Sequence, residues 1–316
     1  MSRIYEALQK AESDRKLDRR EPEPRTPEAS VNSALYATAV ATAEEEQAGA
    51  SAGAHPYLEP SSNRVDPNGL DVRKIPVRPW ALSLERLPSL LERGPAVEQF
   101  RSLRSRIFEL RDISPLKSIM VTSGVPQEGK SFVSTNLAMS LARHKNSKVL
   151  LIDGDMRRYT LHELLGCESH PGLADYLAGK ADLIEVMQRS ESFEGATPGT
   201  AAIAQNLTFI AGGNGGDKAA DLSGSPRFGE LIRLAAPHFD WIIVDSSPVL
   251  PVSDAVNLAR SCDGVLLVAR SGTTKFPTAQ RAQSELKASN ILGFVLNAVE
   301  EQPQVGSYYG YDAAKP

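Results

Sequence analysis

Cysteine is scarce in this chain, which has only Cys167 and Cys262 among its 316 residues, far apart and without the spacing of metal ligands. This scarcity excludes a disulfide-stapled secreted domain and a cysteine-based zinc site. The first residues lack the apolar core of a signal peptide, and nowhere do about 18 apolar residues follow one another. We therefore expect a cytoplasmic protein without a membrane-spanning helix of its own.

The chain also lacks a large excess of charge of either sign. Its formal net charge is −4, which gives no electrostatic case for bulk nucleic-acid binding. Apolar residues make up 41% of the sequence, enough for a sizeable core. We expect a globular protein whose partners do not include nucleic acid.

What the chain does have is a phosphate-binding loop. Residues 124–131 read Gly-Val-Pro-Gln-Glu-Gly-Lys-Ser and match the pattern G-x-x-x-x-G-K-[ST]. A strand-like apolar run, 118–122, precedes the loop, and residues 131–143 follow it with helical apolar spacing. In this context the loop amides cradle phosphates, Lys130 reaches the β- and γ-phosphates, and the Ser131 hydroxyl binds Mg²⁺. The alternative is a glycine-rich turn with a chance Lys-Ser pair.

Two further strand-like segments end in carboxylates. Residues 149–152 run into Asp153-Gly154-Asp155, and residues 241–244 run into Asp245. A single aspartate at a strand end is usually a helix cap. Two such ends beside a phosphate loop instead indicate a metal–nucleotide site, because Mg²⁺ prefers carboxylate and phosphate oxygens. We expect Asp245 to hold the metal through water, Asp153 to assist the metal and accept a proton, and Asp155 to support both.

The sequence divides into four parts. Residues 1–17 carry a small apolar face at helical spacing, which predicts either a short docking helix or a frayed one. Residues 18–80 are rich in Pro, Ala, Glu and Ser and predict a disordered linker. Residues 81–300 are expected to form the folded domain, and residues 301–316 a flexible tail.

The expected domain alternates strand-like and helix-like segments. Such alternation predicts an α/β fold with a mostly parallel sheet and helices on both faces. Ligands of such sheets bind at the carboxyl ends of the strands. The strand-like runs are 118–122, 148–152, 207–211, 241–245, 264–269 and 291–297.

The loop and the two acidic segments together resemble the bacterial tyrosine kinases, over about residues 90–316. That family is built on the phosphate-loop (P-loop) NTPase fold, so the resemblance implies ATP and Mg²⁺ as cofactors. Asn297 resembles a position that contacts adenine, although a turn-capping asparagine is an equally good explanation. The implied residues are Lys130, Asp153 and Asp155 for catalysis, Gly124, Gln127, Glu128, Gly129, Lys130, Ser131, Phe132 and Asn297 for the nucleotide, and Ser131, Asp153 and Asp245 for the metal.

A charged segment before the loop sharpens the resemblance. Glu98-x-x-Arg101-x-x-Arg104 matches the E-x-x-R-x-x-R element through which members of the family form rings. On a helix these residues lie along one stripe, where they can meet opposite charges on a neighbouring copy. The alternative is an exposed helix face with internal salt bridges.

The polar tail holds three of the eight tyrosines, Tyr308, Tyr309 and Tyr311, where no core can bury their rings. We expect them to be autophosphorylation sites that a neighbouring subunit modifies. Each phosphate would add about −1.5 to −2 charges and loosen the ring, and a tyrosine phosphatase would reverse the change. A partner-binding aromatic motif is the alternative.

The resemblance implies an autokinase that regulates exopolysaccharide polymerisation and export. Residues 1–8 look like the start of stand-alone members, so the first helix is a candidate dock for a membrane-spanning polysaccharide co-polymerase that activates the kinase at the inner face of the membrane. One rival is a positioning ATPase of the same broad fold, but such proteins carry an extra lysine where this chain has Ser123-Gly124-Val125. Another is a non-enzymatic scaffold switched by nucleotide.

Overall fold

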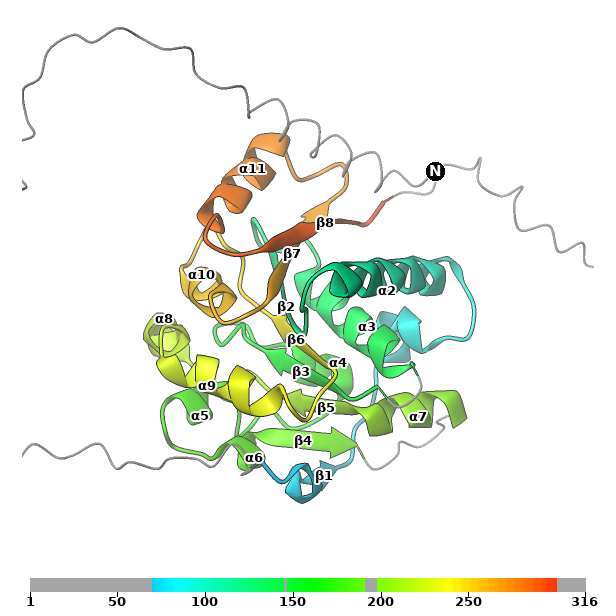
Figure 1. Ribbon diagram of the computed structural model, residues 1–316, viewed down its shortest axis with the longest axis vertical. Helices are drawn as coiled ribbons and strands as arrows, with labels where there is room; N and C mark the ends of the chain where they lie inside the picture. Colours follow the sequence, from blue (N-terminus) through cyan, green and yellow to red (C-terminus); the bar gives the residue numbers. More distant parts are fainter. Residues whose placement is uncertain (1–69, 145–146, 191–197, 300–316) are drawn as a thin grey trace, which may run out of the picture. The chain divides into compact units, whose positions relative to one another are not determined.

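The computed structural model describes residues 70–144, 147–190 and 198–299 (Figure 1). These residues form an α/β unit around an eight-stranded sheet, in the order β1-β4-β5-β3-β6-β2-β7-β8. Within it, the β4–β5 pair is antiparallel and the other pairs are parallel. The strands are β1 (Val77–Arg78), β2 (Ser118–Ser123), β3 (Val149–Asp153), β4 (Met187–Ser190), β5 (Leu207–Ile210), β6 (Trp241–Asp245), β7 (Gly264–Arg270) and β8 (Ile291–Asn297).

The six strand-like runs of the sequence are confirmed as β2, β3, β5, β6, β7 and β8. Every residue of β2, β3 and β6 is buried. Parallel strands covered on both faces require such continuous apolar runs. The predicted α/β class with a mostly parallel sheet is therefore confirmed.

Successive residues of the central strands pack on opposite faces of the sheet. On β3, Val149 and Leu151 belong to one core, and Leu150 and Ile152 belong to the other. The first core includes residues of α2 (Pro95–Ile113), α3 (Lys130–Ala142), α4 (Leu161–Leu165) and α7 (Pro198–Asn206). The second includes residues of α5 (Leu173–Leu177), α6 (Leu183–Val186), α8 (Ala219–Ser223), α9 (Pro226–Ala235), α10 (Asp254–Ala259) and α11 (Phe276–Glu285). Short 3₁₀ turns are η1 (Val72–Lys74), η2 (Leu84–Arg86), η3 (Pro88–Leu90) and η4 (Gly216–Lys218).

Helix α3 is enclosed by the rest of the domain. Residues 133–142 are all buried, because α3 packs on β2, β3 and β6 and is covered by α2 (Figure 1). The buried polar side chains of α3, such as Thr135 and Asn136, donate hydrogen bonds to backbone carbonyls of the preceding turn, so the helix can occupy this interior position without unsatisfied polar groups. The burial fixes the N-terminus of α3, and therefore the phosphate loop, at the carboxyl ends of the central strands.

The linker predicted over residues 18–80 ends too late in the sequence. Residues 77–78 form β1, which pairs with β4, and Trp80 is only 3% exposed. The sequence does not predict this strand, because two residues are too few to show an alternation of apolar and polar side chains. Leu70 and Ile75, before β1, are buried as well. The linker residues before residue 70, the predicted helix at 1–17 and the tail at 301–316 lie outside the described residues.

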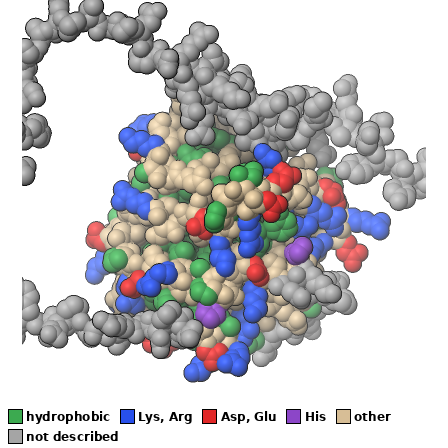
Figure 2. Space-filling model, in the orientation of Figure 1, with side chains coloured by type: hydrophobic (Ala, Val, Ile, Leu, Met, Phe, Trp, Pro, Cys, Tyr) green, Lys and Arg blue, Asp and Glu red, His purple; other side chains and the backbone are tan. Residues whose placement is uncertain are grey.

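The surface of the described domain carries charges of both signs. Figure 2 shows acidic and basic side chains interspersed over the visible face. Across the described residues, no helix combines the length and the apolar character needed to span a bilayer.

Candidate functional site

The phosphate loop joins β2 to α3 and holds its backbone in unusual conformations. Gly129, which directly precedes α3, has φ +93°, a value that favours glycine. Gln127 also has a positive φ, +66°, which costs a residue with a side chain about 1–2 kcal/mol. The loop therefore delivers its amides and Lys130 at the start of a fixed helix, where the helix dipole favours anions.

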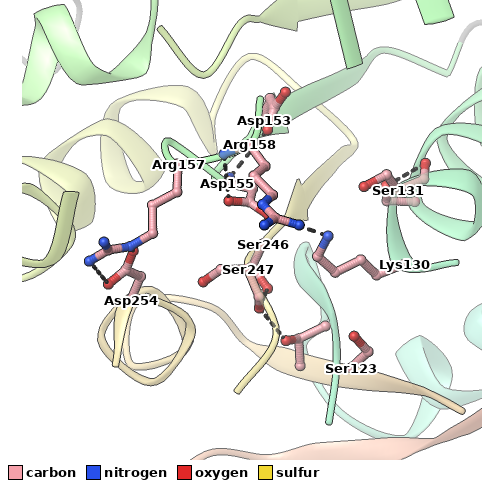
Figure 3. A network of polar contacts seen from close by, with 12 residues as sticks. Ser123, Lys130, Ser131, Asp153, Asp155, Arg157, Arg158, Ser246, Ser247 and Asp254 are labelled. Atoms are coloured by element: carbon pink, nitrogen blue, oxygen red, sulfur yellow. Dashed lines mark hydrogen bonds and ion pairs between the residues drawn. The ribbon is translucent and has the colours of Figure 1, made fainter. Parts of the chain in front are cut away.

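The ends of two strands meet beside this loop. Asp153 ends β3 and Asp245 ends β6, and the two residues are direct partners in the parallel register. The Nζ atom of Lys130 lies 3.3 Å from Oδ2 of Asp155, two residues beyond the end of β3. Figure 3 shows Lys130 reaching from α3 toward Asp155, with Ser246 and Ser247 close by. The structure thus brings the predicted lysine and the acidic strand ends into one site.

The charges of this site perturb one another strongly. Burial lowers the pKa of Lys130, but the carboxylates of Asp245, Asp155 and Asp153 outweigh it and raise that pKa above its usual value. Burial raises the pKa of Asp245 to about 6, although the Lys130 ammonium and the Ser131 hydroxyl oppose the rise. Burial and the charge of Asp245 also hold the pKa of Asp153 well above its usual range. Three buried carboxylates thus share one ammonium group.

The structure separates the roles of the two aspartates after β3. Asp153 is fully buried, and its oxygens accept hydrogen bonds from the amides of Asp155 (3.2 Å) and Leu161 (3.1 Å). Asp155 accepts a bond from the amide of Arg158 (3.1 Å) through Oδ1 and presents Oδ2 to Lys130. In this state Asp153 organises the turn, whereas Asp155 faces the phosphate-binding lysine.

Gly154 lets this turn approach β6. Its amide donates a hydrogen bond of 2.9 Å to the carbonyl of Asp245, and a Cβ at this position would lie 2.5 Å from the same oxygen. Backbone atoms cannot move aside as a flexible side chain can. The glycine between the two aspartates therefore keeps the ends of β3 and β6 together, a signal that the sequence analysis did not use.

We expect Gly154→Ala to destabilise the protein by about 1–3 kcal/mol, because the added methyl group must push the two strands apart. For a domain of this size, each kcal/mol lowers the melting temperature by about 2–4 °C. Thermal unfolding of the nucleotide-free protein measures the effect. Gly224→Ala is the matched control, since its Cβ would meet nothing closer than 3.5 Å. Equal melting temperatures for both variants would contradict the tight approach.

The oxygen donors of the site fit a divalent cation. Oδ1 of Asp245 is buried and has no hydrogen-bond partner within the described ranges. A buried anionic oxygen in that state is costly unless a cation or donor meets it. No three His, Cys, Asp or Glu side chains among the described residues form a ready-made metal site. Mg²⁺ needs no such cage, because it commonly uses one or two carboxylates and completes its octahedron with phosphate and water.

Two residues of the predicted nucleotide set lie apart from the polar network of Figure 3. The ring of Phe132 packs edge-on against Phe100 of α2, with 5.8 Å between centroids. The Nδ2 atom of Asn297 donates a 2.9 Å hydrogen bond to the carbonyl of Glu128. Asn297 therefore contacts the phosphate loop itself, and a contact with adenine stays a prediction.

Arg157, which follows the second aspartate, forms a structural ion pair. Its guanidinium holds both carboxylate oxygens of Asp254, at 2.7 and 3.3 Å. This pair anchors the turn after β3 to the start of α10, away from Lys130 (Figure 3).

The charged stripe of α2 has partners within its own chain. The carboxylate of Glu98 accepts a bond from Arg101, while Arg104 donates to the carbonyl of Ser140 on α3 at 2.7 Å. Burial, Arg101 and Arg143 together lower the pKa of Arg104. Arg101 and Arg104 of the stripe thus form hydrogen bonds within the domain, and the role of the stripe between subunits stays a prediction. Tyr308, Tyr309 and Tyr311 lie outside the described residues.

A phosphate loop that opens a buried helix, beside two aspartate-terminated parallel strands, defines the P-loop NTPase class. The chain belongs to the bacterial tyrosine kinase family. It is 33% identical over 220 residues to the tyrosine-protein kinase YwqD of Bacillus subtilis, which covers 69% of this chain and 86% of that protein. No protein-family model matches this chain.

Further similarities support this membership. The chain is 34% identical over 257 residues to the putative tyrosine-protein kinase EpsB of Ralstonia solanacearum, across 79% of this chain and 32% of that protein. It therefore spans about a third of the length of several curated relatives. The solved kinase domain of the Escherichia coli tyrosine kinase ETK is similar, with a TM-score of 0.59, 33% identity, and coverage of 68% of this chain and 80% of that chain.

Proposed function

We propose that this chain is an ATP-dependent protein-tyrosine autokinase that phosphorylates the tail tyrosines of a neighbouring copy. The observation that carries the proposal is the position of Lys130, on the phosphate loop and 3.3 Å from Asp155, in a chain similar to tyrosine kinases. Phosphoryl transfer needs mainly positioning and positive charge, and this site offers both. The acceptors are Tyr308, Tyr309 and Tyr311.

The loop and its lysine would stabilise the transferring phosphoryl group. Backbone amides of residues 127–131 and the Lys130 ammonium would meet the β- and γ-phosphate oxygens. Ser131 and Asp245, with help from Asp153, would hold Mg²⁺, which when bound neutralises charge on the same oxygens. Lys130 would leave Asp155 for the phosphates.

The transfer itself is a single displacement. The phenol oxygen of a tail tyrosine forms a bond to the γ-phosphorus, and the bond from that phosphorus to the β–γ bridging oxygen breaks, which releases ADP. The phenol proton passes to the Asp153–Asp155 pair. Asp155 presents Oδ2 on the Lys130 side of the site, whereas both oxygens of the buried Asp153 accept hydrogen bonds from the turn, so Asp155 is the more accessible of the two.

Phosphotyrosine mapping tests the proposal. Purified protein incubated with Mg-ATP is expected to carry phosphate on the tail tyrosines, as mass spectrometry would show. Release of inorganic phosphate without phosphotyrosine would instead identify a positioning ATPase. Nucleotide binding without phosphotyrosine or inorganic phosphate would identify a non-enzymatic scaffold.

Transfer between subunits has its own test. We mix a Lys130→Met chain that keeps its tyrosines with an active chain in which Tyr308, Tyr309 and Tyr311 are replaced by phenylalanine. Phosphate is expected on the Lys130→Met chain, because the tail of one copy enters the site of another. A mixture without phosphotyrosine, beside a wild-type control that labels itself, would show that transfer stays within one chain.

The proposed partners follow from the family. Glu98, Arg101 and Arg104 would join copies into a ring, and a membrane-spanning polysaccharide co-polymerase would activate the kinase and recruit it from the cytoplasm to the inner face of the membrane. A tyrosine phosphatase would reset the tail. Addition of the cytoplasmic segment of such a co-polymerase to the labelling reaction is expected to raise the rate, and an unchanged rate would argue against activation.

A further inference from the structure

Glu128 is an unexpected residue in a loop that binds polyphosphate. It is only 2% exposed, and an anion beside phosphate groups repels them. No ion pair to its carboxylate exists among the described residues. Instead, the carboxylate accepts a hydrogen bond from the amide of Val125 at 2.9 Å and another from the hydroxyl of Thr274. The Glu128 side chain therefore links the loop backbone to Thr274.

Thr274 lies in the connection between β7 and α11, far from the loop in sequence. Its hydroxyl oxygen accepts a 2.8 Å bond from the amide of Arg270. With that amide on an oxygen lone pair, the hydroxyl proton is free to point to Glu128. The threonine thus links the β7–α11 connection to the carboxylate of the loop.

Two more bonds from the same side reach the loop backbone. The guanidinium of Arg270 donates to the carbonyl of Gln127 at 3.4 Å, and Asn297 at the end of β8 donates to the carbonyl of Glu128. These carbonyls belong to the strained residue Gln127 and to the residue just before Gly129. Strained backbone persists only where its surroundings fix it, and β7 and β8 supply that support.

We propose that Thr274 is a positioning residue of the phosphate loop, holding Glu128 so that the loop amides face the nucleotide phosphates before the nucleotide arrives. This inference rests on the proposed nucleotide site. Preorganisation lowers the ordering cost of binding, so loss of the hydroxyl weakens nucleotide binding while leaving the transferring groups in place. A threonine that only capped its own turn would have no such effect on binding.

Thr274→Val tests the inference, because valine keeps the shape of the side chain and removes the hydroxyl. We expect the Kd for Mg-ADP, measured by calorimetry, and the KM for ATP to rise about tenfold, which corresponds to 1.4 kcal/mol. The kcat should stay within about twofold. Thr274→Ser should restore both constants. Thr273→Val is the matched control, since Thr273 is exposed and its hydroxyl makes no hydrogen bond to the described residues.

The double variant with Glu128→Gln adds a second readout. If the two residues act through one bond, Thr274→Val in the Glu128→Gln background should change the Kd by less than it does alone. An unchanged Kd for Thr274→Val, or a rise equal to that of Thr273→Val, would overturn the inference. A wild-type protein that binds Mg-ADP but makes no phosphotyrosine would refute the kinase alone, and one that binds no Mg-ADP would refute both.

Discussion

Lys130→Met is expected to reduce tail phosphorylation by about 10²–10³-fold, because it removes a positive charge aimed at the transferring phosphoryl group. The ammonium is held by buried carboxylates at the loop, and its pKa is raised, so it is charged at every physiological pH. Methionine has a similar length but no charge. The rate of phosphotyrosine formation under saturating Mg-ATP measures the loss.

The control for this variant is Lys287→Met, an exposed lysine on the surface of the same domain. It should label its tail at the wild-type rate. Circular dichroism should show that Lys130→Met remains folded. A folded Lys130→Met protein with more than about a tenth of the wild-type rate would contradict the assigned role.

Asp245→Asn is expected to uncouple nucleotide binding from Mg²⁺. Oδ1 of Asp245 is buried and has no hydrogen-bond partner in the described part of the chain, and asparagine would offer the metal a neutral oxygen in its place. Loss of such a group typically weakens metal affinity about 10–100-fold. Calorimetric titration with ADP, with and without Mg²⁺, should show a strong metal effect in the wild type and little in the variant.

The same variant should be more stable than the wild type when no nucleotide is present. The pKa of Asp245 is about 6 in the fold and 3.8 in the reference state. A carboxyl group with a raised folded pKa costs stability above that pKa and costs nothing below the unfolded value. The melting temperature of Asp245→Asn should exceed that of the wild type at pH 8, and the gap should shrink as pH falls through 6 toward 4.

Asp221→Asn serves as the control for both measurements, because Asp221 is exposed on α8. It should keep the wild-type dependence on Mg²⁺ and the wild-type melting curve. An Asp245→Asn protein that binds ADP as tightly with Mg²⁺ as the wild type would remove Asp245 from the metal site.

The parts of the fold that the sequence predicts are those with strong local signals. Each central strand is a run of apolar residues, such as residues 149–152, that can only be buried on both faces. The carboxyl ends of parallel strands share an edge, so the proximity of Asp153, Asp245 and Lys130 follows from three short patterns and the fold class. Their partner in the site, Asp155, also falls within one of these patterns.

The features that the sequence does not predict depend on contacts between segments that are far apart in the chain. β1 has two residues and β4 has four, too few for a periodic pattern, and both exist because they extend the sheet next to β5. Thr274 looks like any polar loop residue until the fold places it against Glu128. The sequence shows the charged stripe of Glu98, Arg101 and Arg104. Only the structure shows that Arg104 donates a hydrogen bond to a backbone carbonyl of α3.

A crystal structure of the protein with Mg²⁺ and ADP tests the central claim most directly, namely that three segments grip one metal-bound nucleotide. The β-phosphate should lie against the amides of residues 127–131, and the metal should lie about 2.1 Å from Ser131 Oγ, with Asp245 bound directly or through water. Lys130 should have left Asp155 for the phosphates. Nucleotide bound elsewhere, or Lys130 still paired with Asp155 beside a bound ADP, would contradict the account.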